Sequence, residues 1–204
     1  MQNGIKTFVA SLAQTCFDRL QSSRDVLTRT GSALALGALH RHVGSLGSAQ
    51  HLKTAVSIAM SLAQDGASPV VQSWSILALS QIAETGGGIY VEPVLSMCVR
   101  ALLSTPSGSP EVALATGKLL SALLTCVGPE LGMGGPASGI EGVRASLLAA
   151  CALQLSHGDV LVRAEGVAGL QQMHLFAPRH VHLANLVLDI ASSQNRLAII
   201  WEFF

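Results

Sequence analysis

The residues best suited to metal chemistry in this chain are two pairs of histidines, each with one residue between the partners. His40 and His42 form the first pair, and His180 and His182 form the second. On a helix, two residues that are two positions apart point about 200° away from each other, so neither pair can chelate one ion. No cysteine or carboxylate cluster completes either set in the sequence. We therefore expect no metal site.

Four cysteines could supply thiol chemistry, but none of them forms a CxxC motif and all lie in apolar helical patterns. Small apolar residues in that setting are usually buried, and unpaired thiols are typical of a reducing compartment. We expect structural rather than catalytic roles for Cys16, Cys98, Cys126 and Cys151.

Two glycine-rich segments could cradle a phosphate, but both lack the required context. Residues 132–139 (GMGGPASG) have no following Lys and Ser or Thr, and residues 85–90 (TGGGIY) do not follow a predicted strand. No nucleophile elbow or catalytic triad pattern is present either. The sequence therefore predicts a protein that is not an enzyme and needs no cofactor, although a deep pocket with converging polar groups would reopen that alternative.

An acidic residue is followed by an arginine one helical turn later at two places. Asp25 precedes Arg29, and Asp159 precedes Arg163. The structural interpretation is an N-cap carboxylate plus an ion pair, within one helix or between neighbouring units. The functional alternative makes the two arginines contacts for an acidic peptide.

The elements that would position these residues recur along the chain. A polar residue opens an apolar-faced helix at Asp25, Ser68, Ser109 and Asp159, at spacings of 43, 41 and 50 residues. The first two spacings match the roughly 40 to 47 residues of a HEAT or armadillo unit, and the third is expected to be such a unit with a longer loop. With the openers aligned, one column is all leucine and a second, three residues on, is apolar. These columns hold Leu36, Leu79, Leu120 and Leu170, then Leu39, Ile82, Leu123 and Met173.

A second apolar helix pattern lies between successive openers, so each unit is predicted to be a helical hairpin. These helices are expected at residues 50–64, 90–104, 140–155 and 180–192, with an incomplete one at 6–20. Residues 128–139 are rich in Gly and Pro and are expected to form a loop. We predict an all-α solenoid of about four HEAT-type repeats and an unfinished fifth hairpin in residues 1–192, followed by a non-repeat apolar tail in 193–204.

Composition excludes several classes of function. The chain is 50% hydrophobic, only 12% charged, and carries 12 basic and 12 acidic residues, so it offers no strong field for nucleic acid. The longest uncharged stretch, residues 66–83, includes a proline, two glutamines and four serines, which disfavours a transmembrane segment. The mean hydropathy of +0.49 and the tail sequence RLAIIWEFF suggest a truncated or spliced piece of a longer solenoid.

Four stretches resemble the HEAT repeat-containing protein 5 family in the amino-acid sequence of their loops. They are TGSALALGALHRHVGSLGSAQHLKTAVSIAMSLAQDG (30–66), VQSWSILALSQIAETGG with YVEPVLS (71–96), TCVGPELGMGG (125–135) and LQQMHLFAPRHVHLANLV (170–187). The resemblance implies a small internal part of a long cytosolic HEAT solenoid. It also implies a non-enzymatic scaffold that associates with aftiphilin, gamma-synergin and the clathrin adaptor complex. Its place would be peripheral, at the trans-Golgi network, endosomes and endocytic vesicles, in endosome-to-Golgi traffic and endocytosis.

Polarity and proximity to loops suggest a protein-contact surface at Arg41, His42, Arg179 and His182. The alternative is a purely architectural spacer without a binding surface of its own. That alternative draws on the scarcity of exposed aromatic and charged residues, because interface hot spots are enriched in Trp, Tyr and Arg.

Overall fold

A computed structural model describes residues 2–43, 49–64, 68–85, 91–104, 109–132 and 140–179, and these residues are all-helical, without a strand. The expected helix at 180–192 and the apolar tail at 193–204 lie outside the described residues. The helices are α1 (Gln2–Ser22), α2 (Val26–Val43), α3 (Ala49–Ala63), α4 (Pro69–Ala83), α5 (Val91–Ser104), α6 (Pro110–Leu131), α7 (Ile140–Leu155) and α8 (Val160–Phe176).

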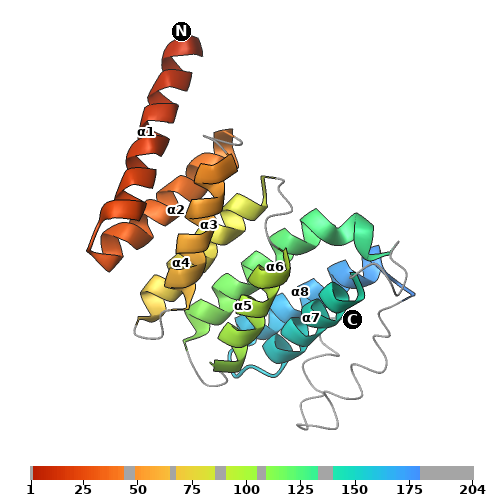
Figure 1. The fold of residues 1–204 in the computed structure, drawn as a ribbon. Helices are drawn as coiled ribbons and strands as arrows, with labels where there is room; N and C mark the ends of the chain where they lie inside the picture. Colours follow the sequence, from red (N-terminus) through yellow and green to blue (C-terminus); the bar gives the residue numbers. More distant parts are fainter. Residues whose placement is uncertain are drawn as a thin grey trace.

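The helices form two layers (Figure 1). In one layer α2, α4, α6 and α8 lie side by side, and each packs extensively against the next. The other layer holds α3, α5 and α7, while α1 stands at the end of the stack and packs chiefly against α2. Helices α2, α4, α6 and α8 each begin directly after one of the recurring openers, so the sequence repeat corresponds to one complete layer.

The packing between the layers differs from the expected hairpins. The sequence pattern suggested that each opener helix pairs with the helix after it. Among the helices outside their own layer, however, α2, α4 and α8 contact chiefly α1, α3 and α7, which precede them. Helix α6 contacts both α5 and α7. Loop length explains this pairing. Three to five residues join each opener helix to the helix before it, whereas five to eight residues join an opener helix to the helix after it. Short connections favour close antiparallel neighbours.

The two aligned columns of apolar residues lie in the core. All four leucines of the first column are buried, and in the second column only Leu39 is partly exposed. The buried residues divide into two clusters. One joins α1 to α2 and to parts of α3 and α4, and the other runs from α3 to α8. The 3.6-residue periodicity in the sequence therefore identifies the surfaces that hold the layers together.

Residues 128–131 do not form the expected loop, because α6 continues through Pro129 to Leu131. Leu131 is fully buried, and the position that a Cβ of Gly128 would occupy lies 2.5 Å from the Phe176 ring. Helix α8 can therefore press its last aromatic ring against α6 only because residue 128 has no side chain. Burial of Leu131 and the packing of Phe176 on Gly128 offset the backbone hydrogen bond that Pro129 cannot donate.

Among the described residues, α6 is long and apolar enough to cross a membrane by length and composition alone. However, 67% of its apolar window is buried inside the structure. The same composition is expected of a helix that other helices surround on several sides.

The openers cap their helices with unequal strength, which leads to a test. The Asp159 carboxylate accepts hydrogen bonds from the backbone N–H groups of Leu161 (2.8 Å) and Val162 (3.3 Å). Ser109 makes no such cap bond, and its hydroxyl donates to the Glu111 carboxylate. We expect Asp159→Ala to lower the free energy of unfolding by about 1 kcal/mol and Ser109→Ala by less than about 0.5 kcal/mol, measured by urea denaturation. Equal losses of unfolding free energy in the two variants would show that the Asp159 cap bonds contribute no stability beyond that of the Ser109 side chain.

Candidate binding groove

One face of each of the helices α2, α4, α6 and α8 lines an open groove of about 950 Å³. The lining residues stand 6, 9, 10, 12, 13 or 16 positions after the opener of their helix. These positions lie on the side of each helix that faces away from the leucine column, so the groove runs across equivalent positions of the aligned repeats. They are Gly31, Leu34, Ala35, Ala38 and Arg41 from α2, then Trp74, Leu77, Ser80, Gln81 and Glu84 at α4 and its end, then Lys118, Ser121, Ala122 and Thr125 from α6, and Glu165 from α8.

The part of the groove over the first halves of α2 and α4 is apolar. Small side chains of α2 leave room beside Leu34 and Leu77, and Trp74 stands at this end with 42% of its surface exposed. A tryptophan left this exposed over small apolar neighbours can supply a large share of the energy of a protein contact.

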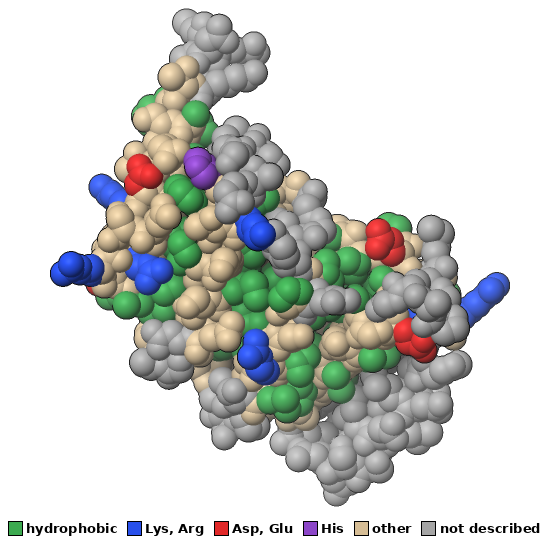
Figure 2. All heavy atoms as spheres, viewed as in Figure 1, with side chains coloured by type: hydrophobic (Ala, Val, Ile, Leu, Met, Phe, Trp, Pro, Cys, Tyr) green, Lys and Arg blue, Asp and Glu red, His purple; other side chains and the backbone are tan. Residues whose placement is uncertain are grey.

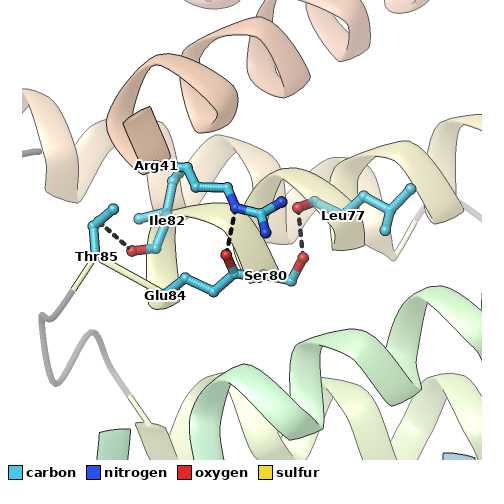
Figure 3. Close-up of polar contacts among 6 residues, drawn as sticks. All are labelled: Arg41, Leu77, Ser80, Ile82, Glu84 and Thr85. Atoms are coloured by element: carbon cyan, nitrogen blue, oxygen red, sulfur yellow. Dashed lines mark hydrogen bonds and ion pairs between the residues drawn. The ribbon is translucent and has the colours of Figure 1, made fainter. Parts of the chain in front are cut away.

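One ion pair spans α2 and the end of α4 at the edge of the groove. Arg41 Nε lies 2.6 Å from Glu84 Oε2, and the two side chains are 50% and 37% exposed. Figure 3 shows the Arg41 guanidinium reaching over α4, beside Ser80, whose hydroxyl donates to the Leu77 carbonyl. An ion pair this exposed adds about 0 to 1 kcal/mol to stability, so its larger effect is to neutralise both charges at this edge.

The expected protein-contact residues are not all brought together. Arg41 lines the groove, His42 is exposed at the end of α2, and Arg179 is exposed just beyond α8. Neither His42 nor Arg179 lines the groove. His182 lies outside the described residues.

The expected Asp–Arg pairs are only half right. Asp25 accepts a hydrogen bond from the Thr28 hydroxyl and a second from the Thr28 backbone N–H (2.9 Å), and these bonds lower the pKa of Asp25. Arg29 does not bond the Asp25 carboxylate, because its Nε donates to the carbonyl of Leu20 at the end of α1 (3.0 Å). Side chains on a helix lean towards its N-terminus, which directs this guanidinium to the end of the preceding helix.

Arg163 behaves in the same way. Its Nη1 donates to the carbonyls of His157 (2.9 Å) and Gly158 (2.7 Å) in the turn before α8, and not to Asp159. Both arginines therefore fasten an opener helix to the turn or helix end that precedes it. This role is structural, and it leaves neither guanidinium facing the groove.

The histidine and cysteine patterns do not converge on a metal site in the described part of the chain. His40 is buried while His42 is exposed, so this pair diverges as helical geometry requires. His180 lies outside the described residues together with His182.

Burial predicts different reactivity for the four free thiols. Burial raises the pKa of Cys98 and of Cys151 to about 12, whereas Cys16 and Cys126 are partly exposed and have smaller increases in pKa. Thiolates are the reactive form, so we expect iodoacetamide at pH 8 to modify Cys16 and Cys126 slowly and to spare the other two. Mass spectrometry of the native and urea-unfolded protein checks this. Rapid native labelling of Cys98 or Cys151 would contradict the described core.

The opposite layer offers a smaller hollow. It holds about 440 Å³ between α3 and α5, and Lys53, Val56, Met60 and Pro93 are among its lining residues. Figure 2, which looks onto the α3, α5 and α7 side, shows few charged side chains among the described residues and no broad basic surface there. This face gives no support to nucleic-acid binding.

Sequence reasoning missed most of the groove. It did not single out Trp74, Glu84, Lys118 or Glu165, which all line this surface. A signal was present, because alignment on the leucine column also aligns the positions on the opposite side of each opener helix. Reading those positions together would have placed these side chains on one face.

Comparison with known proteins corrects the expected family. Protein SWEETIE of Arabidopsis thaliana is 27% identical to this chain over 198 residues, which cover 94% of this chain but only 9% of that protein. No family model and no solved structure matches the chain. The expected membership of the HEAT repeat-containing protein 5 family is therefore wrong. The trafficking role and the named partners rested on that membership, so they are no longer supported. The chain is similar to a short part of a much longer plant protein.

Proposed function

We propose that this chain is a HEAT-type α-solenoid segment that acts as a non-enzymatic scaffold and binds a segment of a partner protein in the groove. The observation that carries the proposal is the continuous groove of about 950 Å³, to which four consecutive opener helices contribute side chains. Stacked helical hairpins commonly bind partners along such extended surfaces.

Three features of the described residues support a solenoid. The opener helices start at a regular sequence spacing, they lie side by side in one layer, and equivalent leucines are buried at each helix. Their packing is local, because the extensive contacts of each opener helix are with its neighbours in the stack. Nearest-neighbour packing of this kind is what distinguishes a solenoid from a closed helical bundle.

Protein binding is favoured over catalysis by the character of the groove. Its surface is wide and open, and it presents Trp74 and aliphatic side chains rather than a set of converging acids and bases. The four unpaired thiols fit a reducing compartment, so we place this scaffold in the cytoplasm.

The test is a selection of peptides from a random library on the whole chain, followed by binding measurements on variants. We expect selected peptides to lose about tenfold or more in affinity with Trp74→Ala, because hot-spot tryptophans typically contribute that much. The matched control is Leu103→Ala, which removes a side chain that is 57% exposed on α5 in the opposite layer.

Peptides that lose affinity only with Trp74→Ala would support the groove as the binding surface. A selection that yields no binder, or only binders insensitive to Trp74→Ala, would overturn the proposal. It would favour the architectural alternative, in which the segment only sets the length and curvature of a longer protein.

A further inference from the structure

The charges in the groove are unevenly distributed. Arg41 and Glu84 neutralise each other at the edge over α2 and α4. The exposed Lys118 on α6 forms no ion pair with any described residue. The groove therefore combines an apolar, neutral end with one free cation about halfway across.

Glu165 on α8 is the remaining charged group of the groove, and it does not neutralise Lys118. Its methylene groups pack over α6 at Gly117, and no ion pair joins its carboxylate to the ammonium of Lys118. A ligand carboxylate that meets Lys118 would have to approach from the α4 side, away from Glu165. That is the side on which Trp74 stands.

The floor of the groove also carries polar groups one to two helical turns beyond these two anchors. Gln81, Ser121 and Thr125 line it. The Ser121 hydroxyl donates to Gln172 Oε1 (3.2 Å) and the Thr125 hydroxyl donates to the Ser121 carbonyl (3.0 Å), so both hydroxyl oxygens keep lone pairs that can accept from a ligand N–H group. An extended peptide needs partners for its backbone N–H and C=O groups, whereas a helical ligand has already paired its own. The polar floor therefore favours an extended ligand that crosses the helices.

The distance between the anchors sets a spacing in that ligand. Trp74 and Lys118 stand on the adjacent helices α4 and α6, six and nine residues after their openers, so their positions in the repeat differ by less than one helical turn. Axes of packed helices are about 8 to 10 Å apart. An extended chain covers that distance in about three residues, at roughly 3.3 Å per residue.

We infer that the groove binds an extended peptide that carries a large apolar side chain for Trp74 and, about three residues away, a carboxylate for Lys118. This inference rests on the proposed protein-binding function of the same groove. It adds the chemical class of the partner segment and a spacing that can be measured.

The experiment repeats the peptide selection on the wild-type chain and on Lys118→Glu, and then measures fluorescence anisotropy with matched peptides. The peptides carry Glu, Gln or Lys at the third position from the apolar anchor, or carry the Glu one or six positions away. We expect the Glu peptide at the third position to bind the wild type about fivefold more tightly than the Gln peptide, as for one partly exposed ion pair.

Charge-reversed variants separate a specific pair from a general field. Lys118→Glu is expected to reverse the order, so that the Lys peptide binds best, and Glu165→Gln is expected to tighten binding of the Glu peptide. The control Lys53→Glu, which makes the same change on α3 in the opposite layer, is expected to leave the order unchanged.

The possible results distinguish a failure of this inference from a failure of the proposed function. Peptides that depend on Trp74 but show no preference for Glu, or no reversal with Lys118→Glu, would overturn the inference and leave the binding groove standing. Equal affinity at all spacings would also overturn it. An absence of any Trp74-dependent peptide would overturn both.

Discussion

Replacing Gly37 by alanine is expected to destabilise this protein by about 1 to 3 kcal/mol, although alanine is the better helix former by about 1 kcal/mol. The reason is the close approach of α2 to α4. A Cβ at residue 37 would lie 2.8 Å from the backbone oxygen of Ala78 and 3.1 Å from its Cα. Because these are backbone atoms, no side-chain rotation relieves the clash, and the two helices must move apart.

Gly31 provides the matched control on the same helix. A Cβ at that position meets no atom within 4 Å, so Gly31→Ala is expected to raise the free energy of unfolding by about 0.5 to 1 kcal/mol. Urea denaturation of both variants measures the difference. If Gly37→Ala stabilises the protein as Gly31→Ala does, the described contact between α2 and α4 is wrong.

Replacing Leu119 by alanine is expected to cost about 2 to 5 kcal/mol, the range for a buried leucine whose removal leaves a cavity. Leu119 is fully buried on α6, which packs against α4 and α8 in its own layer and against α5 and α7 in the other. A loss there weakens several interfaces at once. We therefore expect the urea midpoint to fall without a new intermediate confined to one end of the stack.

Leu103→Ala is the control for this change, because Leu103 is 57% exposed and its removal leaves no cavity. Its expected cost is below about 0.5 kcal/mol. Similar losses for the two variants would contradict the central place of α6 in the stack.

The helices could be predicted from sequence because their determinants are local. The Asp159 carboxylate caps α8 within three residues of itself, and the leucine column follows the 3.6-residue period that burial requires. The continuation of α6 through Pro129 could not be predicted in this way. It depends on Phe176, which is distant in sequence and fits only against a glycine.

The groove and the pairing of helices depend on contacts that the sequence pattern does not contain. Arg29 and Arg163 were expected to pair with an acid, within one helix or between neighbouring units, but each donates to carbonyls of the preceding helix end or turn. Arg41 was chosen for its polarity and its proximity to a loop, and only the packing of α2 beside α4 reveals Glu84 as its partner. The count of repeats and the unfinished fifth hairpin remain predictions.

The most direct test of the binding groove is the fluorescence of Trp74 itself. The chain has two tryptophans, so Trp201→Phe leaves Trp74 as the single reporter. Because 42% of Trp74 is exposed, a peptide that covers it should shift its emission to shorter wavelength in a saturable titration. The account predicts that this shift and the anisotropy change give the same dissociation constant. Saturable binding with an unchanged Trp74 spectrum would contradict it.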